Sequence, residues 1–207
     1  MSNKSKDVII SKKKPSYKVS NYLEDYLKNY NRIQEIPIEY NDLKRYVGSV
    51  KVIDNDDNDT LWQRVFFNDS ERFEIEKNLK LVYNLLYSDG SNENIDFLVV
   101  DAIDYCTFGN SNPFRIKIRN KLNDNFTYYY VKVADSSRIY GLELEHITSP
   151  YNLNFIIYND TLIRGCPQVA LLSKGKFWIF QKTEMEYGEK TQLLYLVFAP
   201  LWALGAT

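Results

Sequence analysis

The chain is poor in the residues that build most metal and redox sites. It has one histidine, His146, and two cysteines, Cys106 and Cys166, among 207 residues. No other cysteine or histidine stands at zinc-site spacing, so His146 is expected at the surface or at a helix end. The cysteines could form one bridge, but free thiols in a reducing compartment are expected. A Cys106–His146 thiol–imidazole pair would lack a recognisable oxyanion site.

The chain also lacks an excess of charge of either sign. The 26 Lys and Arg residues nearly balance 27 Asp and Glu residues, which leaves a net charge of −1. This balance gives no bulk attraction to nucleic acids or membrane surfaces, so no nucleic-acid partner is expected. Residues 1–20 are polar and basic and contain no apolar core of a secretory signal. They are expected to form a disordered basic tail of a cytoplasmic protein, with a targeting or anion-binding arm as the alternative.

Several enzyme motifs are absent from the sequence. It contains no P-loop, no Gly-X-Gly-X-X-Gly and no Gly-X-Ser-X-Gly motif. The acidic run at residues 54–59 begins like a calcium loop. However, Asp59 occupies the position of the sharp-turn glycine and Val65 that of the bidentate glutamate. A solvated acidic loop is therefore expected, and no metal site is identified.

The apolar content of 44% suffices for a core, and its pattern predicts an α+β fold with a mostly antiparallel sheet and flanking helices. Strands are expected over residues 95–105, 114–118, 126–133 and 153–158, with 114–133 forming a hairpin and a further short strand within 42–53. Helices are expected over 21–34, 70–87 and 136–147. The central helix carries an apolar stripe of Phe73, Ile75, Leu79, Val82, Leu85 and Leu86. These elements define an α+β domain over residues 21–163.

Residues 164–207 are expected to add a hairpin and an apolar C-terminal segment. Residues 193–206 read LLYLVFAPLWALGA, which is shorter than the roughly 20 apolar residues of a membrane span. Burial in the core, the stump of a longer protein and a membrane-dipping tail are the three alternatives, of which the first two are preferred. The segment is expected to govern solubility, and a chain ending at Lys190 is expected to keep its fold.

One constellation indicates a specific chemistry. A loop containing Gly109 connects two expected strands, Lys132 stands inside the next strand in the run VKVA, and Glu143 and Glu145 lie in the helix that follows. This order of elements resembles the amino-terminal lobe of the protein-kinase-like fold over less than a third of the chain. In that family a strand lysine pairs with nucleotide phosphates and with a helix glutamate. The resemblance implies that ATP would bind at Lys132, with Glu143 or Glu145 as partner and Gly109 in the phosphate loop.

The sequence departs from the kinase pattern in ways that bear on catalysis. It contains neither a His-Arg-Asp nor an Asp-Phe-Gly motif, and only 75 residues follow Lys132. The expectation is a truncated or pseudokinase-like lobe that binds a nucleotide or phosphate and does not transfer it alone. The alternative for Lys132 is an outward-facing strand lysine, and for the glutamates a solvated helix face.

Two non-kinase alternatives remain. The first is a non-enzymatic α+β interaction module that docks a protein partner through its sheet or its apolar C-terminal segment. The second rests on the basic and aromatic residues that interleave over 114–119 and 128–132. Such a sheet face could stack single-stranded nucleic acid, but the balanced charge of the chain argues against it.

Overall fold

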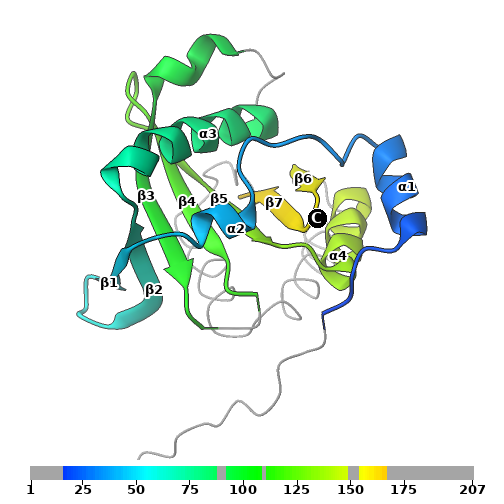
Figure 1. Cartoon of the computed structure of the whole chain (residues 1–207), viewed down its shortest axis with the longest axis horizontal. Coiled ribbons are helices and arrows are strands. Elements are labelled where there is room, and N and C mark those ends of the chain that lie inside the picture. Colours follow the sequence, from blue (N-terminus) through cyan, green and yellow to red (C-terminus); the bar gives the residue numbers. More distant parts are fainter. Residues whose placement is uncertain (1–15, 88–91, 109–110, 149–153, 167–207) are drawn as a thin grey trace, which may run out of the picture.

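The computed structural model describes residues 16–87, 92–108, 111–148 and 154–166 (Figure 1). It confirms the expected α+β fold with an antiparallel sheet. Seven strands follow the order β1-β2-β3-β4-β5-β7-β6, and every neighbouring pair is antiparallel. The strands are β1 Gly48–Ile53, β2 Asp59–Phe66, β3 Leu98–Cys106, β4 Phe114–Asn120, β5 Phe126–Val133, β6 Phe155–Tyr158 and β7 Thr161–Gly165. The helices are α1 Asn21–Asn29, α2 Tyr40–Leu43, α3 Asp69–Tyr87 and α4 Ser136–Thr148, with a 3-10 turn at Asn92–Phe97.

Helix α3 covers one side of the sheet, which we call the α3 face (Figure 1). Its buried side chains recur at helical spacing, so they form one stripe. They pack on alternate residues of the strands, and the shared core includes Ile75, Leu79, Val82, Leu86, Phe114, Ile116, Ile118, Tyr129, Val131 and Ile163. Phe73 was expected in this stripe, but its side chain is 78% exposed. It lies two residues before Ile75, about 200° around the helix, and therefore points to solvent.

Helices α1 and α4 cover the other side of the sheet, which we call the second face, only at its β7–β6 end (Figure 1). Successive strand residues point to opposite sides, so Leu162 packs under these helices while Ile163 packs under α3. The second core consists of Leu23, Leu27, Ala134, Ile139, Leu142, Phe155, Ile157 and Leu162. The second face thus has two parts. Helices α1 and α4 cover its β7–β6 end, and the other part lies over β2 to β5.

The sheet edge at β6 is paired with a segment that follows α1. The Ile157 amide donates to the Arg32 carbonyl at 2.8 Å, and the Gln34 amide donates to the Ile157 carbonyl at 3.2 Å. Helix α1 was expected to continue to residue 34. It ends at Asn29 because Asn31 adopts a positive φ of 56° and the chain then turns to pair with β6.

The end of the expected N-terminal tail is anchored to the start of α4. The Tyr17 amide donates to the Asp135 carboxylate at 2.8 Å, and the Ser136 amide donates to the Tyr17 carbonyl at 2.9 Å. Burial alone would raise the pKa of Asp135. Hydrogen bonds from the Ser137 hydroxyl, the Tyr17 amide and Ser16 outweigh it and lower the pKa to about 2. Residues 1–15 lie outside the described residues.

Other expected boundaries differ from the observed ones. Strands β2 and β7 were not expected at all, and residues 95–97 belong to the 3-10 turn rather than to β3. Strand β7 runs across residue 163, where the domain was expected to end. The expected hairpin beyond β7 and the apolar segment 193–206 lie outside the described residues.

Candidate functional site

A row of charged and aromatic side chains crosses the second face. Six positions are directly paired from strand to strand over β2, β3, β4, β5, β7 and β6: Arg64, Asp104, Arg115, Tyr130, Arg164 and Phe155. We call these six residues the transverse row. Adjacent strands lie about 4.8 Å apart, so the row is about 24 Å long. The row therefore provides alternating charge and aromatic surface on rigid strands.

A buried carboxylate fixes two arginines of the row. Asp104 is 1% exposed. It accepts hydrogen bonds from Arg64 Nε at 2.5 Å and from Arg115 Nη2 at 2.8 Å. Charge-assisted bonds of this kind are stronger than neutral ones and hold the guanidinium planes in place. Asp104 thus orients the positive end of the row.

Aromatic rings lie directly against these cations. The Arg115 guanidinium carbon is 4.4 Å from the Trp62 ring centre and 5.2 Å from that of Tyr128. On the next strands, the Arg164 guanidinium carbon is 5.2 Å from the Tyr130 ring. Trp62 and Tyr130 also contact each other, with their ring centres 6.3 Å apart. Each contact of this type is attractive, because a cation favours the negative face of an aromatic ring.

The neighbouring positions of β4 and β5 repeat this arrangement closer to solvent. Lys117 is paired with Tyr128, and Arg119 with Phe126. Lys117 Nζ lies 4.3 Å from the Phe126 ring centre, and Phe126 is 54% exposed. Asp101 of β3 receives Arg119 Nε at 2.9 Å and has Lys117 Nζ at 3.8 Å. This part of the second face is open, whereas Trp62, at 8% exposed, is enclosed.

Lys132 lies on the second face next to the transverse row. It is paired with Leu162 of β7 and stands two residues from Tyr130 on the same strand. The diagonal neighbour on β7 is Arg164, two residues from Leu162. Lys132 is 9% exposed, so its side chain is enclosed between the row and the α1–α4 end. The register therefore brings Lys132, Tyr130 and Arg164 together.

The two glutamates of α4 have different surroundings. Glu143 is 7% exposed and accepts a hydrogen bond from Arg32 Nε at 3.0 Å. The Arg32 guanidinium carbon lies 4.8 Å from the ring centre of Phe155, the last residue of the row. Glu145 is half-buried. An ion pair between Lys132 and either glutamate stays a prediction, and Gly109 lies outside the described residues.

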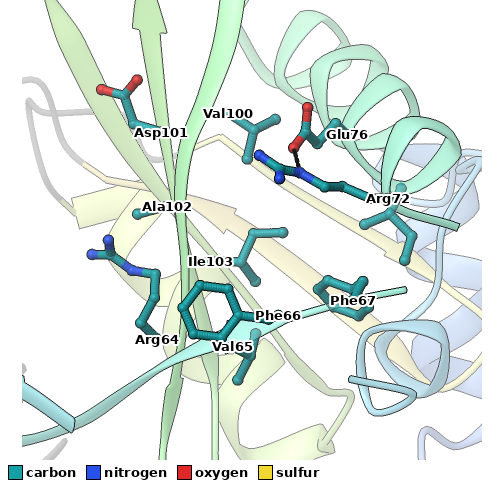
Figure 2. A pocket seen from close by; sticks show the side chains of 11 residues that line it. Arg64, Val65, Phe66, Phe67, Arg72, Glu76, Val100, Asp101, Ala102 and Ile103 are labelled. Atoms are coloured by element: carbon teal, nitrogen blue, oxygen red, sulfur yellow. Dashed lines mark hydrogen bonds and ion pairs between the residues drawn. The ribbon is translucent and has the colours of Figure 1, made fainter. Parts of the chain in front are cut away.

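A small pocket lies on the other side of β2 and β3. Its volume is about 130 Å³, below the range of typical small-molecule sites. Figure 2 shows Val100 and Ile103 pointing towards α3, where Arg72 and Glu76 form an ion pair, while Arg64 and Asp101 point away. The pocket wall is mostly apolar and offers no convergent set of polar groups. We therefore place the candidate site on the second face.

Other chemistries find little support in the described part of the chain. That part contains no group of three or more His, Cys, Asp or Glu residues that could hold a metal. The acidic run is the turn between β1 and β2, where Asp54 accepts the amides of Asp56 and Asn58 at 2.9 and 2.8 Å. Cys106 and Cys166 form no disulfide with each other, and both are partly exposed. Burial raises the pKa of Cys106, which disfavours the nucleophilic thiolate.

Sequence reasoning missed most of the transverse row. The polar side of β4 was visible as alternation of Arg115, Lys117 and Arg119 with isoleucines. Asp104 was hidden in an apolar run, and Arg64 and Arg164 belong to strands that were not expected. A signal was nevertheless present, because Trp62 and Arg64 stand at strand spacing.

No family model matches the sequence, and no curated protein or solved structure is significantly similar to it. Within the described residues, no helix combines the length and the apolar character needed to cross a membrane.

Proposed function

We propose that this chain is a non-catalytic binding lobe that holds the phosphate groups of a nucleotide such as ATP beside Lys132. The observation that carries the proposal is the register that brings Lys132, Tyr130 and Arg164 together on the second face. An ammonium and a guanidinium group on adjacent strands can share one phosphate. The half-buried Tyr130 ring, which contacts Trp62, supplies an aromatic surface for the base.

The order of elements supports the kinase-like part of this proposal. Strand β3 is followed by a loop, then by β4, by β5 with Lys132, by α4 with Glu143 and Glu145, and by β6. This is the order that the resemblance implies for an amino-terminal kinase lobe. Helix α4 packs on the same face that carries Lys132, because Leu162 opposite Lys132 belongs to the α1–α4 core.

The proposal is binding without phosphoryl transfer. In protein kinases, one aspartate accepts the substrate proton, and further residues hold magnesium. The sequence contains neither of the motifs that supply these groups. Positioning and metal electrostatics provide nearly all of the rate enhancement in this chemistry, so a bound nucleotide is expected to remain intact.

The test is calorimetric titration of the chain with ATP, ADP and inorganic phosphate, using Lys132→Met as the variant. Methionine keeps the apolar stem of this enclosed side chain and removes only the charge. Loss of a charged hydrogen bond is expected to weaken ATP binding by about tenfold or more. The matched control is Lys51→Met, because Lys51 is 69% exposed on β1, four strands away from Lys132 in the sheet.

Two results would overturn the proposal. The first is an ATP affinity that is equal in the wild-type, Lys132→Met and Lys51→Met chains. The second is magnesium-dependent transfer from labelled ATP that is lost in Lys132→Met, since this would make the chain an enzyme.

A further inference from the structure

We infer that the open part of the second face binds single-stranded nucleic acid, RNA or DNA. The surface consists of Arg64, Lys117, Arg119, Phe126 and Tyr128, and we call it the β4–β5 surface. None of these residues is part of the nucleotide site beside Lys132. The inference therefore goes beyond the proposed function and can fail or succeed independently of it.

The first argument is an exposed aromatic ring in a polar setting. Phe126 is 54% exposed, and its ring centre lies 5.6 Å from that of half-buried Tyr128. An open phenyl ring on a strand surface contributes little to the core. Nucleic-acid bases stack on such rings whatever their sequence, because every base has a π-face.

The second argument is the distribution of charge over the molecule. The described strands of the second face carry six cationic side chains and two carboxylates, Asp101 and Asp104, and a third carboxylate, Asp124, adjoins Arg119 from the β4–β5 turn. The cations are Arg64, Arg115, Lys117, Arg119, Lys132 and Arg164. Many carboxylates lie elsewhere, in the β1–β2 turn and on α3. The balanced charge of the whole chain was the ground for expecting no nucleic-acid partner. The net charge of the whole chain does not describe the charge of one face. The balanced total therefore does not exclude nucleic-acid binding at this surface.

The cations of this surface reach solvent, while Asp104 holds Arg64 and Asp101 holds Arg119 on their inner sides. Arg64 and Arg119 are 37% and 34% exposed, and Lys117 is 28% exposed. The pairing of Arg119 with Asp124 involves a carboxylate that is 82% exposed, and such surface pairs are weak. Phosphate oxygens can replace this partner at little cost.

The combination of rings and cations favours a nucleic acid over an acidic protein segment. Both would meet the positive charges, but only a nucleic acid offers flat bases to Phe126 and Tyr128. Strands β2 to β5 span about 14 Å, which suits on the order of four nucleotides, the lower end of single-strand site sizes. A rigid duplex would present its bases in the stack, away from the rings.

The experiment measures fluorescence anisotropy of labelled twelve-nucleotide dT and rU strands with the full chain at several salt concentrations. Three phosphate contacts predict a slope of about −2 for log K against log salt. Phe126→Ala is expected to weaken binding about tenfold, because one stacking platform is removed. Phe73→Ala is the matched control, since Phe73 is 78% exposed on α3, and it should change the affinity less than twofold.

Further arms separate this inference from the nucleotide site and from a protein ligand. Lys117→Ala should reduce the salt slope by about 0.7, and it should leave ATP affinity in the calorimetric titration within about twofold, because Lys117 is not part of the site beside Lys132. The inference is wrong if neither strand binds at low salt, or if Phe126→Ala and Phe73→Ala bind equally well. It is also wrong if polyglutamate displaces the strand as effectively as unlabelled oligonucleotide, because the surface would then recognise charge alone.

Discussion

The contact between Gly165 and Tyr87 offers a sharp test of how β7 joins the sheet to α3. A methyl group at Gly165 would lie 2.7 Å from Tyr87 Oη and 3.1 Å from Cζ. The hydroxyl has little freedom to move, because it accepts the Cys166 amide at 2.9 Å and donates to the Tyr128 carbonyl at 3.2 Å. Gly165→Ala should therefore destabilise the fold by overpacking.

The expected loss of stability in Gly165→Ala follows from these two close contacts. Forcing an extra methyl group into a packed site costs about 1–3 kcal/mol. For a chain of this size, each kcal/mol lowers the melting temperature by about 2–4 °C. Tyr87→Phe alone removes the hydroxyl and should cost about 0.5–1.5 kcal/mol, because the Cys166 amide loses its acceptor.

The double variant Tyr87→Phe/Gly165→Ala tests whether the clash with the hydroxyl causes the loss of stability. Tyr87→Phe removes the closest atom to the new methyl group, so the Gly165→Ala change should be milder in its presence by about 1 kcal/mol. Urea denaturation of the four chains, followed by circular dichroism, measures this coupling. Strictly additive losses would refute the clash and place the effect of Gly165→Ala in the unfolded chain or in the backbone.

Two further predictions concern carboxylates. Asp104→Asn should destabilise the fold by about 1.5–3 kcal/mol in urea denaturation, because two charged hydrogen bonds are weakened; Asp124→Asn, at an exposed pair, should change it by less than about 0.5 kcal/mol. Asp135 has a folded pKa of about 2, below its ordinary 3.8, so its stabilisation is complete above about pH 4 and is lost as the pH falls towards 2. The stability of Asp135→Ala, measured across this window, should vary less with pH than that of the wild-type chain; parallel curves would contradict the assignment.

Local patterns in the sequence were enough to predict the central elements of the fold. The β4–β5 hairpin and helices α3 and α4 were predicted closely, because each has one buried side with a clear period and a polar turn or cap at its end. Strand β2 was missed for a physical reason. Trp62 is enclosed on the second face and Val65 is buried on the α3 face, so apolar and polar residues occur on both sides and no period of two appears.

The candidate site could be predicted only in part. The basic side of β4 and the position of Lys132 within a strand are local features. The contact of Arg115 with Asp104, and of Tyr130 with Arg164, depends on the strand order β3-β4-β5-β7. That order is set by packing between distant segments, which periodicity in a single sequence does not reveal.

The most direct test of the central claim is a nuclear magnetic resonance titration of the isotope-labelled chain with ATP. We expect the amide signals of Tyr130, Lys132 and Arg164 to shift together and to saturate at one dissociation constant. The signals of Phe73 and Glu74, on the outer side of α3, should stay in place. Shifts confined to α3 or to the β1–β2 turn, or no saturable shift on the second face, would contradict the account.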